Sequence, residues 1–247
     1  MTENAKHKTA GLARLCRVLI LSLAICPLSS VWAAAPSRVS ANYDIYKGGL
    51  KIGQIVETFT RDKDRYALTS TTRAVGLLAV FQPGRIIITS NGLINPRGLQ
   101  PLHFLDRRES DAGKERRADF DWNTRRLTLT EHGQKRVLAL PDGTQDRLSA
   151  MYQFMFLSLA NSDALNFNMT NGSKLDLYNY RITPGQSVTV PLGTFRALYV
   201  ASVPEAGVNR TEIWLAEDHA GFPCKMVITD PDGGKLSQEL TGFDYVP

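Results

Sequence analysis

Apolar and polar residues alternate with a period of two over much of this chain, and this spacing constrains its fold more than any other feature. In residues 39–45 every second residue is apolar, and the residues between them are Ser, Asn and Asp. Side chains of a β-strand point alternately to its two faces, so this pattern indicates strands with one buried face. Turn-forming residues separate such segments at Lys47-Gly48-Gly49, Pro83-Gly84 and Asn95-Pro96-Arg97-Gly98. Short strands divided in this way predict an antiparallel sheet.

The predicted strands form two groups along the chain. The first group contains strands near 39–45, 55–59 and 65–72, and a charged meander at 103–110, 114–122, 125–131 and 136–140. The second group contains strands at 174–183, 186–190, 194–203, 210–216, 225–229 and 235–243. Acidic and basic residues are interleaved in the meander, so they can pair across neighbouring strands. We interpret the charged side of the meander as a solvated sheet face, with an anion-binding patch as the alternative.

One segment breaks the alternation. Residues near 144–160 are rich in helix formers, and apolar side chains would point to nearly all sides of the helix: Leu148, Met151, Tyr152, Phe154, Met155, Phe156, Leu157 and Leu159. A helix that is apolar all round must be covered on most sides. The sequence therefore predicts a mainly β fold, in which a large curved antiparallel sheet (a half-barrel or open barrel) encloses one long internal helix. Asp146 and Ser149 form a polar pair at its start, suited to capping the first turn.

Residues 1–33 have the pattern of a secretory signal peptide. Four basic residues (Lys6, Lys8, Arg14 and Arg17) precede the apolar run 18–25, and small residues follow from Ala33 onward. We predict cleavage after Ala33, which leaves a single β-rich domain at 34–247. No later segment has the roughly 20 apolar residues needed for a transmembrane span. The predicted location is a bacterial periplasm.

The cysteines also bear on export. Ile25 stands where a lipoprotein signal needs a small residue before Cys26, so lipid attachment at Cys26 is not expected. Signal cleavage removes Cys16 and Cys26, which leaves Cys224 without a disulfide partner. A catalytic cysteine would need an identifiable basic partner, and the local sequence indicates none for Cys224, so we predict a packed strand residue.

The distribution of charge argues against a nucleic-acid partner. The chain has a formal net charge of +5, but its first 33 residues carry four basic residues and one acidic residue. The remaining residues include 25 basic and 23 acidic side chains, a net charge of only +2. A nucleic-acid-binding domain would show a strong excess of positive charge on one face.

Motifs for catalysis, cofactor binding and metal binding are missing from the predicted mature chain. It contains no G-x-S-x-G, no phosphate-binding loop, no dinucleotide fingerprint and no H-E-x-x-H. Its histidines, His103, His132 and His219, are widely spaced and give no metal-ligand pattern. We therefore predict no catalytic residue, metal or cofactor, and favour a non-enzymatic protein. A hydrolase using Ser149 and Asp146 is an alternative that would need a histidine between them.

Several segments, taken in order, resemble the bacterial domain-of-unknown-function family 3108. They are 43–53, 90–92, 101–104, 120–122, 141–149 and 212–215 with Pro223. The strongest parts of the resemblance are the helix start Gln145-Asp146-x-Leu148-Ser149 and the strand Ile213-Trp214-Leu215. The resemblance implies an exported, β-rich envelope protein of unassigned activity and supplies no catalytic residues. The segment from Trp214 onward is also similar to periplasmic half-barrel lipoprotein carriers, in which a curved sheet wraps an apolar cavity.

These patterns support two main functional hypotheses. In the first, the helix and the sheet enclose an apolar groove for an acyl chain or a lipophilic peptide, lined by Met151, Tyr152, Phe154, Met155, Phe156 and Trp214. The same residues would equally serve to fill a solid core. In the second, the protein is an interaction module of the cell envelope that docks a protein partner through the charged meander. Charge reversal at Arg116 and Arg117 would test that docking face.

Overall fold

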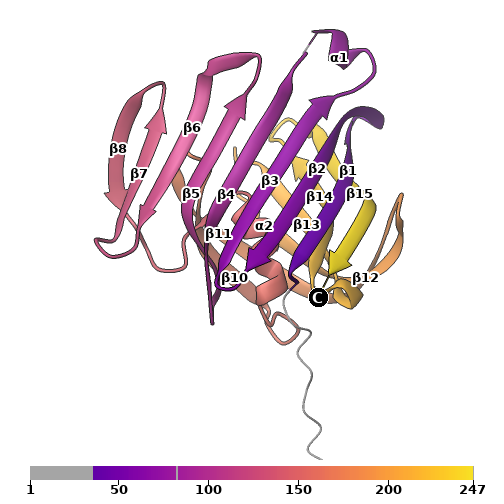
Figure 1. The fold of residues 1–247 in the computed structure, drawn as a ribbon. Helices are drawn as coiled ribbons and strands as arrows, with labels where there is room; N and C mark the ends of the chain where they lie inside the picture. The colour runs from indigo at the N-terminus through magenta and orange to yellow at the C-terminus, as the bar shows by residue number, and fades with distance from the viewer. Residues whose placement is uncertain (1–35, 82, 247) are drawn as a thin grey trace, which may run out of the picture. The chain divides into compact units, whose positions relative to one another are not determined.

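A computed structural model describes residues 36–81 and 83–246 of the chain, so the predicted signal peptide and its cleavage site at Ala33 lie outside the described residues. Within the described residues, fifteen strands belong to one open sheet whose two edge strands are β8 and β9. Figure 1 shows this sheet bending so that strands from the second half of the chain lie behind strands from the first half. The prediction of a mainly β fold is confirmed.

The first eight strands cross the sheet in chain order, each antiparallel to its neighbours. They are β1 (Arg38–Lys47), β2 (Leu50–Asp62), β3 (Arg65–Ala74), β4 (Arg85–Asn95), β5 (Gly98–Arg108), β6 (Asp111–Asp121), β7 (Arg126–Glu131) and β8 (Gln134–Ala139). A single helical turn, α1 (Leu78–Phe81), lies in the connection between β3 and β4. The predicted turn at Lys47-Gly48-Gly49 joins β1 to β2, with positive φ angles at Gly48 and Gly49 that glycine adopts readily.

The second half of the sheet joins the first through its last strand. β15 pairs with β1 in antiparallel fashion, and the order then runs back through the chain to β10. The strands are β10 (Ala164–Thr170), β11 (Leu175–Val190), β12 (Gly193–Ser202), β13 (Arg210–Ala216), β14 (Phe222–Thr229) and β15 (Lys235–Val246). A 3-10 turn, η2 (Glu217–His219), precedes β14, and the two-residue strand β9 (Gln145–Asp146) runs parallel to β10.

Two features of this half were not predicted. Strand β10 was missing from the prediction, and the predicted strands at 174–183 and 186–190 are parts of the single strand β11. The prediction that Pro184-Gly185 connects two strands is wrong, because β11 pairs with the same neighbour, β12, before and after the register shift at this point. The two residues therefore form a β-bulge, a role in which a glycine with positive φ is common.

The predicted long helix at 144–160 is wrong. The helical segment comprises α2 (Ser149–Gln153) and the 3-10 turn η1 (Phe154–Phe156), eight residues in all. At its start, Gln145 and Asp146 extend the sheet instead, and the backbone N–H of Arg147 donates to the carbonyl of Thr170 at 2.9 Å. At its end, Leu157 adopts an extended conformation. In residues 144–160 the helix propensity of the sequence is therefore outweighed by sheet pairing at the start and by the burial of side chains in two different clusters.

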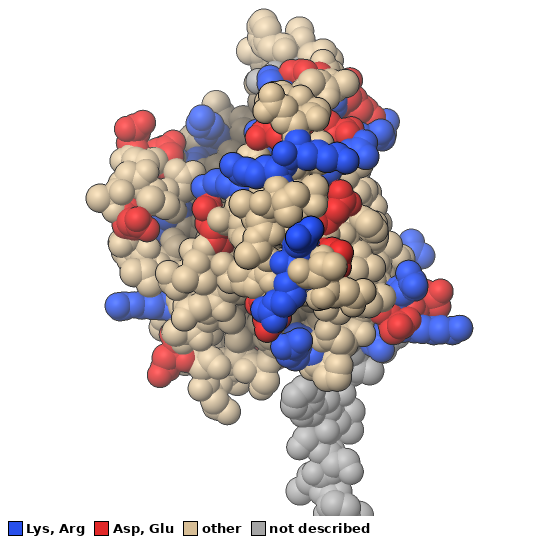
Figure 2. Space-filling view, turned by 90° about the vertical axis from the view of Figure 1, so that its left-hand side faces the viewer, with Lys and Arg blue, Asp and Glu red and all other residues tan. Residues whose placement is uncertain are grey.

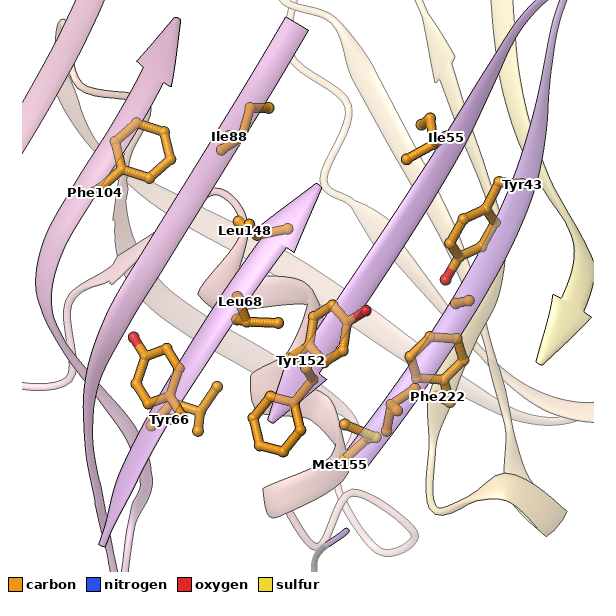
Figure 3. Close-up of a cluster of buried hydrophobic side chains, with 14 of the residues drawn as sticks. Tyr43, Ile55, Tyr66, Leu68, Ile88, Phe104, Leu148, Tyr152, Met155 and Phe222 are labelled. Carbon is orange, nitrogen blue, oxygen red and sulfur yellow. The ribbon is translucent and has the colours of Figure 1, made fainter. Parts of the chain in front are cut away.

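This short helical segment lies inside the bend of the sheet. Tyr152 and Met155 belong to a large apolar cluster with residues of the first strands, whereas Phe154 belongs to a second cluster with residues of β11, β12 and β13. Figure 3 shows Tyr152 between Leu68 and Phe222, which come from opposite halves of the sheet. The helical segment is apolar on most sides because it is packed from both halves.

Candidate functional site

The structure places the predicted groove residues of the helical segment in the protein core. Tyr152, Phe154 and Met155 are buried, and Met151 and Phe156 are half-buried. The ring of Tyr152 stacks on Phe59 with centroids 5.7 Å apart and meets the edge of Phe222 at 5.6 Å. These side chains therefore contact one another and both halves of the sheet.

Trp214, the sixth predicted groove residue, has a different environment. It lies on β13 beside Ile213, and since neighbouring side chains in a strand face opposite sides, it points away from the cluster that contains Ile213 and Phe154. Its ring is half-buried, 5.0 Å from the ring of Tyr199, with the Lys225 ammonium 5.9 Å from its centroid. Trp214 packs against the large cluster that contains Tyr152 and Met155, whereas Phe154 belongs to the second cluster.

The space beside the helical segment is small. A cavity of about 10 Å³ lies there, and its lining includes Tyr43, Glu57, Met151, Tyr152 and Phe222. That volume is enough for about one water molecule, whereas small-molecule pockets have volumes of roughly 300 to 1,000 Å³. This cavity is therefore too small for a drug-sized ligand with the side chains as they stand in this structure.

A buried carboxylate that the sequence analysis missed lies next to this cavity. Glu57 accepts hydrogen bonds from Ser70 Oγ at 2.9 Å and from the Tyr152 hydroxyl at 3.2 Å. Burial raises the pKa of Glu57 above its usual value, although these two hydrogen bonds oppose the shift. The available signal was its position, because Glu57 is in phase with Ile55 and Phe59 on the buried face of β2.

A second buried carboxylate, Asp146, holds the start of α2. It accepts hydrogen bonds from Ser90 Oγ at 2.5 Å and from the backbone N–H groups of Leu148 and Ser149 at 2.9 and 2.8 Å. Tyr66 shares a hydrogen bond of 3.0 Å with Ser90, which extends the network to β3. Burial raises the pKa of Asp146, while its hydrogen bonds to Ser90 and to the backbone oppose the shift.

Ser149 and Asp146 are not arranged as a hydrolase would require. Ser149 Oγ has no exposed surface and donates to the backbone carbonyl of Asp146 at 3.1 Å. His103 lies at the surface, where its Nδ1 is 2.9 Å from Asp119, and His219 packs against Phe195. In the described residues no histidine forms a hydrogen bond with Ser149, so the pair lacks a general base.

The thiol of Cys224 is a packed strand side chain in this structure. It is fully buried, and its Sγ donates to the carbonyl of Trp214 at 3.3 Å. Burial raises the pKa of Cys224 to about 11, which keeps the thiol protonated at neutral pH. A protonated, buried thiol is a poor nucleophile.

The larger hollows lie on the outer face of the charged meander. A groove of about 420 Å³ is lined by residues of β6, β7, β8 and their turns: Ala112, Gly113, Glu115, Arg117, Asp119, Thr130, His132, Gly133 and Lys135. A second groove of about 270 Å³ is lined by Thr89, Asn91, His103, Phe104, Leu105, Arg117 and Asp119. Arg117 and Asp119 belong to both linings, so the two grooves adjoin. We refer to them together as the meander groove.

Charged groups in the meander groove are partly neutralised by neighbours. Arg117 forms an ion pair with Glu115 at 2.6 Å, and His103 is paired with Asp119, while Lys135 forms no ion pair with any described residue. Figure 2 shows Lys and Arg side chains, with acidic side chains among them, on the side of the molecule where β8 forms the sheet edge. These groups offer both hydrogen-bond donors and acceptors to a bound segment.

Arg116 and Arg117, predicted to act on one docking face, point to opposite faces of β6. Arg117 lines the meander groove, whereas Arg116 forms an ion pair with Glu131 at 2.8 Å and contacts the loop at Gly172, where an added Cβ would lie 2.9 Å from the Cβ of Arg116. Adjacent residues of a strand must face opposite sides. Only Arg117 can therefore contact a molecule in the meander groove.

No group of three or more His, Cys, Asp and Glu side chains is placed to hold a metal ion within residues 36–81 and 83–246. None of the helices in these ranges combines the length and the apolar character that crossing a bilayer would require.

Comparison with solved structures supports the fold. A β-barrel-like protein of Brucella abortus, from the domain-of-unknown-function family DUF1849, is 14% identical and matches with a TM-score of 0.58, covering 85% of this chain and 98% of that one. A protein assigned as a lipoprotein from Parabacteroides distasonis is 9% identical, with a TM-score of 0.38 and coverage of 85% and 96%. At these identities the first match shows a shared fold alone.

The sequence comparisons decide the family. No curated protein matches the chain. The profile of DUF3108, described as a protein of unknown function, matches residues 42–241, which include all fifteen strands at least in part. The resemblance seen in the sequence is thereby confirmed, and the chain belongs to the DUF3108 family.

Proposed function

We propose that this protein is an exported, non-enzymatic module of the bacterial cell envelope that binds a partner protein in the meander groove. The observation that carries the proposal is a contrast in volume. The adjoining grooves on the outer face measure about 420 and 270 Å³, whereas the cavity beside the helical segment measures about 10 Å³. The outer grooves therefore offer more space for a bound group than the cavity beside the helical segment does.

The chemistry of the meander groove favours an extended protein segment that carries carboxylates. Arg117 and Lys135 supply cationic donors, and Asp119 and Thr130 supply acceptors for backbone N–H groups. The adjacent strand β8 pairs with β7 on one side and forms the sheet edge on the other. A free edge accepts an extended segment through main-chain hydrogen bonds, while side chains beside it select the sequence.

Export rests on the leader pattern in residues 1–33, with the single domain 34–247 as the exported product. The basic start, the apolar run and the small residues at the expected cleavage site support this part of the proposal. Amino-terminal sequencing of the protein recovered from the periplasm tests it. The expected first residue is Ala34, and recovery of the uncleaved chain from the cytoplasm would contradict export.

The acyl-chain hypothesis is not favoured, since five of the six residues assigned to that groove belong to the helical segment packed between the two halves of the sheet. Burial of a lipid chain there would require the helical segment to leave Tyr152's contacts with Phe59 and Phe222. Lipid mass spectrometry of purified protein separates the two ideas. We expect no stoichiometric lipid, and a bound acyl lipid at one mole per mole would overturn the preference for the outer face.

The binding proposal is tested by charge reversal in the meander groove. Arg117→Glu places an acidic group where a partner carboxylate would bind, so we expect at least a tenfold loss of the partner recovered from envelope extracts. Arg126→Glu is the matched control, because Arg126 is an exposed arginine of β7 that lines neither groove. Equal recovery with both variants, measured by quantitative mass spectrometry, would contradict the proposal.

A further inference from the structure

We propose that the apolar tip formed by Leu50, Leu77, Val80 and Phe81 inserts into the surface of an anionic lipid bilayer. These residues belong to two neighbouring turns at one end of the sheet, the β1–β2 turn and the α1 connection between β3 and β4. The inference concerns a surface apart from the meander groove and stands without the proposed function. We refer to these four residues as the apolar tip.

The geometry of the apolar tip is unusual for side chains of this size. Leu50, Leu77, Val80 and Phe81 are between 72% and 76% exposed. The backbone N–H of Val75 donates to the carbonyl of Ile52 at 3.0 Å, which holds the two turns side by side. Figure 1 shows α1 projecting beyond the ends of the neighbouring strands, and Figure 2 shows uncharged side chains at the same upper extremity.

The local fold presents these side chains outward rather than hiding them. Hydrogen bonds from Ala79 N–H to the Gly76 carbonyl and from Val80 N–H to the Leu77 carbonyl, both 3.2 Å, close the single turn of α1. Leu78 and Ala79 face inward and are half-buried, so the turn directs its remaining apolar side chains to the outside. Exposed apolar residues gathered in one place mark an interaction site more often than scattered ones.

Charges around the apolar tip match an anionic surface. Four basic side chains lie at the ends of these strands: Lys47, Lys51, Arg73 and Arg85. Lys51 is paired with Asp44 at 2.7 Å and Arg85 with Glu109 at 2.9 Å, whereas Lys47 and Arg73 have no carboxylate within ion-pair distance among the described residues. Among these four basic residues and their two carboxylate partners, the balance is therefore positive. Basic residues behind an inserted apolar group are attracted by anionic headgroups.

The size and shape of the apolar tip favour a lipid surface over a protein surface. A stable protein interface buries about 800 Å² on each partner and involves about 20 to 30 residues a side. Four side chains on a convex projection are too few for that, and a second copy of the chain would meet the same positive charges. Insertion into the headgroup region needs only a few apolar side chains with basic residues beside them.

Vesicle binding tests the inference with the full chain. We expect sedimentation with vesicles of phosphatidylcholine and phosphatidylglycerol, and weaker sedimentation with phosphatidylcholine alone or at high salt. Phe81→Ser should weaken partitioning by about tenfold or more, because a phenyl ring no longer leaves water. The matched control is Leu177→Ser, an exposed leucine of β11 that should leave partitioning unchanged. Equal partitioning of both variants would overturn the inference.

Charge variants test the contribution of the basic residues beside the apolar tip. The double variant Lys47→Gln with Arg73→Gln should weaken binding to phosphatidylglycerol vesicles by about fivefold for each charge removed. Lys63→Gln, in the β2–β3 turn at the opposite end of the strands, is the control and should have no effect. A loss no larger than that of the control would contradict the role of the basic residues.

A local reporter shows which part of the chain enters the bilayer. In Phe81→Trp the new indole should be quenched by brominated phospholipids beyond the quenching seen in the parent chain, whereas Leu177→Trp should show no excess. Quenching at neither position, in protein that sediments with the vesicles, would place insertion elsewhere and overturn the inference. Self-association that Phe81→Ser abolishes, detected by analytical ultracentrifugation without lipid, would assign the tip to a second copy and likewise overturn it.

Discussion

At the scale of single residues, two carboxylates in the interior connect the helical segment to the sheet. Glu57 binds the hydroxyl of Tyr152, and Asp146 binds Ser90 together with the first amides of α2. Buried polar groups that lack partners are costly, so such hydrogen bonds fix the position of the groups that make them. Each carboxylate is a specific tether between α2 and the strands of the first half.

The ionisation of Glu57 gives a prediction about pH. Because burial raises its pKa in the folded protein, the folded state binds more protons than the unfolded state between the two pKa values, and the free energy of unfolding falls as pH rises from about the usual value of 4.5. Glu57→Gln removes this contribution, so its stability should decline less with rising pH in urea titrations. The exposed Glu205→Gln is the control. Parallel curves for wild type and Glu57→Gln would contradict the prediction.

Asp146 gives a prediction about stability. Asp146→Ala leaves Ser90 Oγ and the buried amides of Leu148 and Ser149 without their acceptor, so we expect a loss of about 3 kcal/mol in the free energy of unfolding. Asp146→Asn retains one acceptor oxygen and should lose about half as much. Asp142→Ala removes an exposed carboxylate paired with Arg125 and should cost less than about 1 kcal/mol. If Asp146→Ala lowers the free energy of unfolding as little as Asp142→Ala does, measured by chemical denaturation, Asp146 does not stabilise the start of α2.

At the scale of elements, the helical segment acts as a packing link between two clusters. Its apolar content correctly indicated burial on most sides, but its length depended on partners remote in the sequence. Gln153 illustrates this, since its side chain accepts from the N–H of Leu99 at 2.6 Å and donates to the carbonyl of Arg97 at 2.8 Å. These bonds fix the segment against β5. No local pattern encodes such a contact.

Removal of the Tyr152 ring tests this link. Tyr152→Ala deletes a side chain packed on Phe59 and Phe222, so we expect a loss of about 4 kcal/mol in the free energy of unfolding. Tyr152→Phe keeps the packing and loses only the hydrogen bond to Glu57, which should cost about 1 kcal/mol. Phe81→Ala, a ring in the exposed tip, should change stability by less than about 0.5 kcal/mol. Similar losses for the two alanine variants would contradict a linking role for α2.

At the scale of the whole molecule, the sheet is held together where the two ends of the described chain meet. β1 and β15 pair over ten residues, from Arg38 with Val246 to Lys47 with Leu236. The edge strand β9 is brought close to the first half of the sheet, because Gln145 of β9 donates to the carbonyl of Leu99 on β5 at 2.8 Å. The sheet thus curls toward a barrel but remains open between β8 and β9.

Deletion of the last strand tests how much the pairing of β1 with β15 contributes to folding. Removal of residues 235–247 exposes the edges of β1 and β14 and uncovers the core around Leu240, so the truncated chain should not fold. Deletion of Glu205 and Ala206, in the exposed loop between β12 and β13, is the control and should preserve a cooperative thermal transition. A cooperative transition in the truncated chain, measured by circular dichroism, would show that folding does not need the pairing of β1 with β15.

Much of the architecture follows from local sequence. The alternation of apolar and polar residues identified twelve of the fifteen strands at least in part and missed β4, β9 and β10. Glycine-containing turns set most of the hairpins. Both signals involve residues close together in the chain. The same alternation would have predicted that Glu57 points inward, because it lies between Ile55 and Phe59 on the same face of β2. The outward position of Arg117 and the inward position of Arg116 follow from it as well.

Tertiary structure decided the rest. The pairing of β1 with β15, the parallel contact of β9 with β10, the end of the helical segment at Phe156 and the filled interior all depend on residues far apart in the chain. Alternation tells which side of a strand is buried but not which element covers it. The packing of the helical segment therefore depends on the fit of side chains from both halves of the sheet, a property that no single segment contains.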